Sequence, residues 1–273
     1  MAQTKVLIVV KTYPAISSKY EEIVCTAGFR EDGSWIRIYP IQFRQKSYEE
    51  QYKKYGWIEL DLVKNKSDFR PESFRPYSLD SEIKIVDHID TKNNWAERKK
   101  HVLQKIYYNL TELITEAQDR SICTSLAVFK PKKILDFTIE AVEREWNQAK
   151  IAKLEAEREQ GNLFQQPENP FAVVRKLPYK FSYIFEDESN RESCLMIEDW
   201  EIGQLYWNCL AKHEGNESKA CDDVRKKYFD DFAKTKDLHL LLGTSQLHHF
   251  VSKNPFMIIG TFHPKKELQG SLF

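Results

Sequence analysis

The 273-residue sequence lacks any long apolar run. No stretch approaches the roughly 20 apolar residues that a membrane-spanning helix needs. The segment "VLIVV" near the N-terminus is followed at once by Lys11, and it has neither the length nor the cleavage site of a signal peptide. We therefore expect a cytoplasmic protein with no membrane partner.

Cysteine is scarce and net charge is absent. The five cysteines are an odd, widely spaced set, which fits reduced thiols better than a disulfide framework. Basic and acidic side chains number 41 each, which argues against a protein built only to coat nucleic acid. Residues 1–137 nevertheless hold 23 basic against 19 acidic side chains, so an anion-binding surface is expected in the first half.

The first half of the chain has the pattern of a β-rich module. The hydrophobic share of 41% is sufficient for a packed core. Aliphatic or alternating runs predict strands over residues 5–12, 21–30, 35–40, 57–63 and 82–89. The segment "EDGS" between the second and third of these contains Asp-Gly, a strong hairpin signal.

The returning strand of this hairpin, "WIRIYP", carries an unusual pattern. A period of two puts Trp35, Arg37 and Tyr39 on one face. Ile36 and Ile38 lie on the other face, and we predict that they form a core with one face of the preceding strand. The residues of that face are Ile23, Cys25, Ala27 and Phe29.

The rest of the chain predicts helices and further strands. One amphipathic helix is expected over residues 94–118, an exposed charged helix over 143–160, and a helix near 217–234. Asp199 is placed to cap another helix. Strands are expected over residues 125–140, 179–185, 191–197, 238–243 and 255–262.

These elements predict an α+β fold in three parts. Residues 1–140 form a β-rich module with the long amphipathic helix. Residues 141–172 form the charged helix and a linker, and residues 173–273 form a second, β-rich module with packed helices. The strand region 125–140 could serve either module.

A strand face reading Trp-x-Arg-x-Tyr suits an unstacked base or a single strand of nucleic acid. Aromatic faces stack bases at about 1–3 kcal/mol each, and an arginine supplies a cation for phosphate. In the loops that follow, two Phe-Arg-Pro triplets present their arginines, because proline excludes helix there. The predicted nucleic-acid-binding residues are Trp35, Arg37, Tyr39, Arg44, Lys46, Arg70 and Arg75.

A second interpretation of this face remains open. Exposed-looking aromatics on a strand also serve as contacts between domains. Trp35 and Tyr39 would then lie under a helix, a second domain or a partner protein, with Arg37 paired to an acid. Only if a partner protein covered the face would the protein be an interaction subunit of a larger complex.

The segment "VCTAGFREDGSWIR" resembles the opening of dual-OB-like domains of uncharacterised prokaryotic proteins. The resemblance covers about residues 5–40, and after Arg37 the sequence has Ile38-Tyr39 before Pro40, where the family pattern has proline directly. It implies a small β-barrel with a nucleic-acid-binding role in phage defence or mobile-element biology. The matching residues are Cys25, Ala27, Gly28, Gly33, Trp35, Ile36 and Arg37.

Candidate catalytic and metal-binding residues are isolated in the sequence. The acidic residues at 186–188 are typical of an exposed turn, and among those at 198–201 Asp199 is typical of a helix cap. Both roles are better supported by the sequence than a Mg²⁺ site. Cys209, His213 and Cys221 lack a fourth zinc ligand, and the late histidines lack a nucleophile at a known spacing. We assign no catalytic residue, metal or cofactor. The alternative of a metal-dependent hydrolase acting on nucleic acid or nucleotides would use the acids near 198–201 or the late histidines.

Overall fold

Strands of the first hundred residues close into a small barrel. The computed structural model describes residues 3–17, 21–78, 80–149, 151–152 and 174–267. The barrel strands are β1 (Gln3–Lys11), β3 (Glu21–Arg30), β4 (Trp35–Ile41), β5 (Gly56–Lys64) and β6 (Ser73–Pro76). They follow the order β1-β3-β4-β6-β5, and β5 closes the barrel by pairing with β1. The predicted OB-like barrel is confirmed.

Shorter elements complete this module. β2 (Ala15–Ser17) pairs with β3, and β7 (Lys84–His88) pairs with β5. Between β4 and β5 lie two 3-10 helices, η1 (Phe43–Gln45) and η2 (Tyr48–Glu50). The pairing of β4 with β6 is parallel, whereas the other pairs in the barrel are antiparallel.

The β3–β4 turn fixes which residues face which way. The Arg30 amide donates to the Ser34 carbonyl at 2.9 Å, and Gly33 has a φ of +80°. This loop sets Phe29 opposite Trp35 and Ala27 opposite Arg37. Directly opposite residues of an antiparallel pair share a face.

The predicted core of this hairpin is therefore wrong. Ile36 and Ile38 do not pack with Ala27 and Phe29, which lie on the opposite face of the hairpin. The isoleucines instead fill the barrel interior, which is fully closed to water. The interior residues include Val6, Ile8, Val24, Ile36, Ile38, Ile58 and Leu60.

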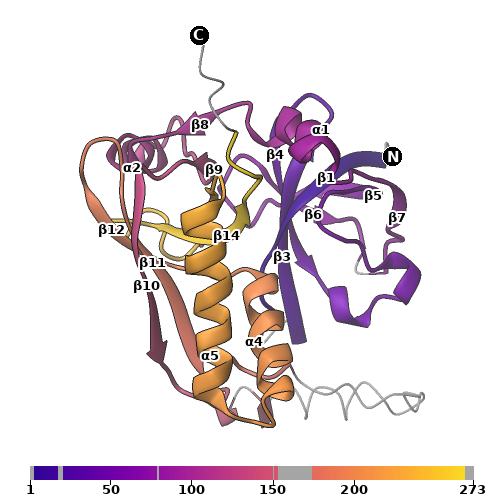
Figure 1. Cartoon of the computed structure of the whole chain (residues 1–273). Helices are drawn as coiled ribbons and strands as arrows, with labels where there is room; N and C mark the ends of the chain where they lie inside the picture. Colours follow the sequence, from indigo (N-terminus) through magenta and orange to yellow (C-terminus); the bar gives the residue numbers. More distant parts are fainter. Residues whose placement is uncertain (1–2, 18–20, 79, 150, 153–173, 268–273) are drawn as a thin grey trace.

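The second module packs two sheets against helices. Its four-stranded sheet has the order β14-β13-β9-β8, from β14 (Phe256–Phe262), β13 (His239–Thr244), β9 (Leu126–Phe129) and β8 (Ile106–Tyr107). Its three-stranded sheet is β10 (Lys133–Ala141), β11 (Tyr179–Glu186) and β12 (Glu192–Met196). The strands predicted within 125–140 thus pair with strands of the C-terminal half. β9 packs against the barrel, whereas Figure 1 shows β10 on the side away from it.

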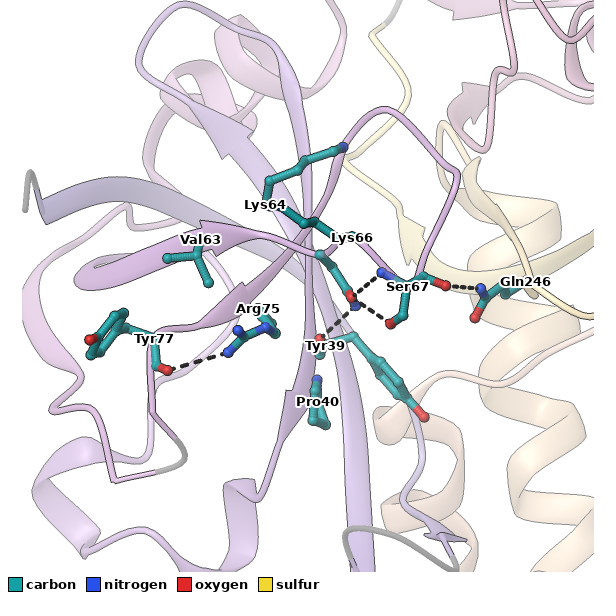
Figure 2. A pocket seen from close by; sticks show the side chains of 10 residues that line it. Tyr39, Pro40, Val63, Lys64, Lys66, Ser67, Arg75, Tyr77 and Gln246 are labelled. Carbon is teal, nitrogen blue, oxygen red and sulfur yellow. Dashed lines mark hydrogen bonds between the residues drawn. The ribbon is translucent and has the colours of Figure 1, made fainter.

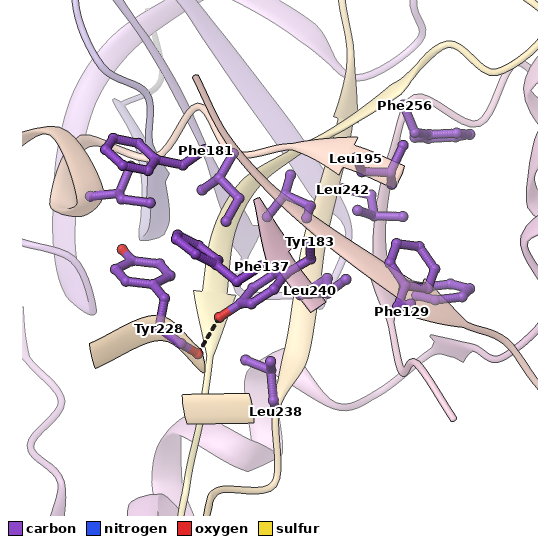
Figure 3. Packing of buried hydrophobic residues seen from close by; sticks show 14 of the residues in the cluster. Phe129, Phe137, Phe181, Tyr183, Leu195, Tyr228, Leu238, Leu240, Leu242 and Phe256 are labelled. Carbon is purple, nitrogen blue, oxygen red and sulfur yellow. Dashed lines mark hydrogen bonds between the residues drawn. The ribbon is translucent and has the colours of Figure 1, made fainter. Parts of the chain in front are cut away.

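The core of the second module is rich in aromatic residues. Phe137, Phe181 and Tyr183 lie under α5 (Glu217–Arg225) and the π-helix η3 (Lys226–Ala233), and the Tyr183 hydroxyl donates to the Tyr228 carbonyl at 2.6 Å (Figure 3). The helix α4 (Trp200–Lys212) begins at Asp199, whose side chain accepts from the Glu201 amide, as predicted. None of the helices in the described residues has the length and apolarity needed to cross a bilayer.

The single helix predicted over 94–118 is wrong. Two helices occupy this region, α1 (Lys92–Val102) and α2 (Leu110–Gln118), and β8 lies between them. At the predicted start of the helix the backbone is not helical, with a φ of 52° at Asn94 and 64° at Trp95. Asn109 instead caps α2 and accepts the Thr111 amide at 2.9 Å. Part of the helix predicted over 143–160, and the linker after it, lie outside the described residues.

Candidate nucleic-acid interface

The outer face of the β3–β4 hairpin is covered by the second module. Trp35 stacks on Phe29, with ring centroids 4.1 Å apart, and both pack in a cluster with residues of β9, β13 and β14. The cluster joins Leu7, Val9 and Ala27 to Val128, Leu241 and Ile259. The expected solvent exposure of this face is therefore wrong for Trp35, which is half-buried.

Arg37 is buried at the junction of the two modules. Only 3% of the residue is exposed, and its guanidinium donates to the Ser125 hydroxyl at 2.9 Å and to the Ser125 carbonyl at 3.2 Å. Glu72 lies 3.7 Å from the same nitrogen. The outward-facing arginine predicted from the sequence is wrong. At Trp35 and Arg37 the second interpretation is correct, because the second module covers this part of the face and the arginine is paired to an acid. A buried charge requires such partners.

Arg70 is also buried and has a structural role. Its Nε lies 2.9 Å from Asp68 Oδ1 and its Nη2 lies 2.6 Å from Asp68 Oδ2, while Nη1 donates to the Thr244 carbonyl at 2.5 Å. Burial alone would raise the pKa of Asp68, but the bonds from Arg70 and Ser73 hold it below its ordinary value. The expectation that Arg70 is presented to a phosphate is wrong, because the guanidinium ties the β5–β6 loop to the second module.

Two further predicted residues lie near the 3-10 helices. Arg44 is exposed in η1. Lys46 is half-buried and donates to the Ser81 carbonyl at 2.9 Å, with Glu50 3.6 Å away. Their predicted contact with phosphate stays a prediction.

Tyr39 and Arg75 come together in a groove of about 700 Å³ where β4, β5 and β6 end (Figure 2). In that view Tyr77 and Tyr39 lie on opposite sides of Arg75. Only Tyr39 and Arg75 were predicted from the sequence. The lining residues are Tyr39, Pro40, Val63, Lys64, Asn65, Lys66, Ser67, Arg75, Tyr77 and Gln246.

The groove is electropositive. Its lining includes three cationic side chains, Lys64, Lys66 and Arg75, and no carboxylate. Lys64 donates to the Arg70 carbonyl at 3.1 Å, and Arg75 donates to the Tyr77 carbonyl at 3.3 Å. Within the described part of the chain no carboxylate forms an ion pair with any of the three cations, so their charge is available to an anion.

Hydrogen bonds fix the wall of the groove. Asn65 is 7% exposed, and its Oδ1 accepts from the Ser67 hydroxyl at 2.7 Å while its Nδ2 donates to the Tyr39 carbonyl at 3.5 Å. Gln246 of the second module donates to the Ser67 carbonyl at 2.6 Å. The loop that carries Lys66 is thus held in place by both modules (Figure 2).

A second polar cluster lies where α4 meets the barrel. The Lys54 ammonium lies 3.3 Å from Asp199 and 2.9 Å from Glu201. Asp199 is fully buried, and this burial raises its pKa to about 6 although Lys54 is close. Lys54 also holds the pKa of Glu201 below its ordinary value against the effect of burial.

The other candidate catalytic residues have structural partners. Asp187 is buried and accepts the Leu110 amide at 2.9 Å. His213 lies 2.9 Å from Asp223. His249 is buried, with Nδ1 2.7 Å from the Thr244 hydroxyl and Nε2 2.7 Å from the Ala117 carbonyl. The described residues contain no group of three or more His, Cys, Asp or Glu side chains that could hold a metal ion.

Two family models match the chain. Residues 2–104 match one described as a domain of unknown function, DUF8758, and residues 88–273 match another so described, DUF8757. No curated protein matches. Among solved structures, the chain is similar to one titled "Structure of murine DNA binding protein bound with ds DNA", with 10% identity, a TM-score of 0.33 and 98% of each chain covered. A likeness at that TM-score says nothing about what this chain binds.

Proposed function

This chain belongs to the family of the domain of unknown function DUF8757, and we propose from its groove that it is a non-enzymatic nucleic-acid-binding protein. The observation that carries the proposal is the lining itself. Two tyrosines and three cationic residues line it, with no carboxylate among the lining residues. Interleaved aromatic and basic side chains are the means by which proteins hold single-stranded nucleic acid.

The side chains divide into two roles. Tyr39 and Tyr77 stack on bases, a contact worth about 1–3 kcal/mol per base. Lys64, Lys66 and Arg75 contact the phosphates and displace counterions. The stacking role requires bases whose faces are free, so the ligand is a single strand or an unstacked base. Arg44 remains a predicted phosphate contact outside the groove, and the link to phage defence remains a prediction.

Fluorescence anisotropy with a labelled single-stranded oligonucleotide tests this function at several salt concentrations. We expect Lys66→Ala to lower the slope of log affinity against log salt by about 0.7, since one phosphate contact is lost. Tyr77→Ala lowers affinity about 5- to 100-fold and leaves that slope unchanged.

Lys133→Ala is the matched control, because Lys133 is an exposed lysine on β10 of the second module. It should bind as the wild type does. If the wild-type protein binds no oligonucleotide, or if Lys133→Ala and Lys66→Ala reduce binding equally, the groove is not the site.

A further inference from the structure

A second aromatic platform lies on the surface beyond the groove. Phe69, in the β5–β6 loop, is 48% exposed and stacks on Phe250 of the second module, with ring centroids 4.8 Å apart at 28°. The guanidinium carbon of Arg120 lies 4.5 Å from the Phe250 centroid. Two stacked rings and a cation thus meet at the junction of the modules.

The platform begins where the groove ends. Ser67 lines the groove and Phe69 follows two residues later, so their Cα atoms lie within about 7 Å. On the other module, Gln246 lines the groove and Phe250 belongs to the same loop. The hydrogen bond from Gln246 to the Ser67 carbonyl joins the two loops at 2.6 Å.

The charge of the platform matches that of the groove. Arg120 is exposed, and within the described residues no carboxylate forms an ion pair with it. The neighbouring Asp119 carboxylate accepts from the Ser121 amide at 2.8 Å and from the Ser121 hydroxyl at 2.6 Å. Arg70, beside Phe69, is neutralised by Asp68. A cation over one ring, next to an exposed aromatic face, suits a base and its phosphate.

Aliphatic side chains are also exposed on these loops, namely Val251 at 81%, Leu247 at 75% and Ile122 at 50%. Alone they would equally suit a protein partner. Continuity with the cationic groove and the position of Arg120 favour nucleic acid.

We propose that a single strand bound in the groove continues across the module junction onto the Phe69–Phe250 platform. This inference rests on the proposed function. The two modules then form one bipartite site, and the β5–β6 loop lies between its halves. A strand long enough to reach both halves binds more tightly than one that fills the groove alone.

Anisotropy with two single-stranded oligonucleotides tests the path, one of about 4 and one of about 12 nucleotides, which both lie within the usual range of site sizes. The Phe69→Ala/Arg120→Ala protein should lose about tenfold in affinity for the longer strand and nothing for the shorter. Arg120→Glu, which keeps both rings, should give the same length-dependent loss. Tyr77→Ala in the groove should weaken both.

Three results would overturn the path. One is that both platform variants bind the longer strand as the wild type does, while Tyr77→Ala still binds it more weakly. In that case the groove remains the binding site, and the two rings contact another partner. Another is an equal loss for both lengths, which would place the platform residues within a single short site. The third is no effect of Tyr77→Ala on either length, which removes the proposed function together with the path.

Discussion

Replacing Lys54 with methionine should lower the free energy of unfolding, because it leaves a buried carboxylate unpaired at the junction of α4 with the barrel. The ammonium lies 3.3 Å from Asp199 and 2.9 Å from Glu201. Asp199 is fully buried, whereas about half of the Glu201 side chain reaches water. Methionine keeps the aliphatic length but leaves Asp199 without the ammonium that forms its ion pair.

The magnitude follows from the burial of Asp199. Removing one partner of a buried ion pair costs about 3–5 kcal/mol of unfolding free energy. At roughly 2–3 °C per kcal/mol for a chain of this size, the melting temperature should fall by about 6–15 °C at pH 7. Glu201 adds less to this loss, because solvent screens its charge.

The loss should depend on pH, with a sign that the pKa of Asp199 sets. Its folded pKa, about 6, is above the ordinary 3.8, so the folded state binds the extra proton and wild-type stability rises as pH falls from about 6 to 4. Lys54 lowers this pKa, so without Lys54 the folded pKa rises further and the variant begins to gain stability at a higher pH than the wild type. The gap between variant and wild type should therefore shrink between pH 7 and pH 5, by at most about 1.4 kcal/mol.

Urea unfolding at pH 7 and pH 5 measures both quantities. The matched control is Lys54→Met with Asp199→Asn, since asparagine still caps a helix and no buried charge remains. We expect this double variant to be more stable than Lys54→Met at pH 7 and to show no such change of the gap with pH. An equal loss at both pH values, together with a double variant no better than the single one, would refute the buried carboxylate as the cause.

Three other substitutions test the fold and the corrected roles. Gly28→Ala should destabilise the protein by about 3 kcal/mol in thermal unfolding, because a Cβ there would lie 1.9 Å from the Leu7 carbonyl oxygen of the neighbouring strand. Arg37→Met should lower the melting temperature, because it leaves Glu72 without its cation. Its affinity for the oligonucleotide per folded molecule should equal that of the wild type. A loss of affinity in a folded variant would show that the arginine belongs to the binding site. Asn109→Ala should cost about 1 kcal/mol in urea unfolding through loss of the α2 cap, and no change would show that the cap is dispensable.

The local sequence pattern was sufficient to predict where the strands lie, but not which face of each strand points into the barrel. The predicted ranges 21–30 and 35–40 match β3 and β4 closely. Alternation could not tell the inside of the barrel from the outside, because both faces of these strands are buried. The loop of five residues between Phe29 and Trp35 sets the register of the hairpin. The length of this loop could have predicted that Ala27 and Arg37 lie opposite each other on one face.

The candidate site was predictable only where its residues are close in sequence. The triplet containing Arg75 led to the groove, and Lys64, Lys66 and Tyr77 lie in the same short stretch, where the basic and aromatic pattern could have found them. The partners that bury Arg37 and Arg70 are remote in the chain, at Ser125 and Thr244. No local pattern reports a contact over such a distance.

The covering of the barrel by β13 and β14 has a consequence for synthesis on the ribosome. The last barrel strand ends at Pro76, but β14 ends at Phe262, about 190 residues later. At ordinary rates of translation that interval lasts about 10–40 s. Throughout it the newly made barrel displays Leu7, Phe29 and Trp35 to the solvent, and Arg37 has no partner in Ser125 until β9 has emerged. We expect the nascent chain to need a chaperone on this face until the second module closes over it.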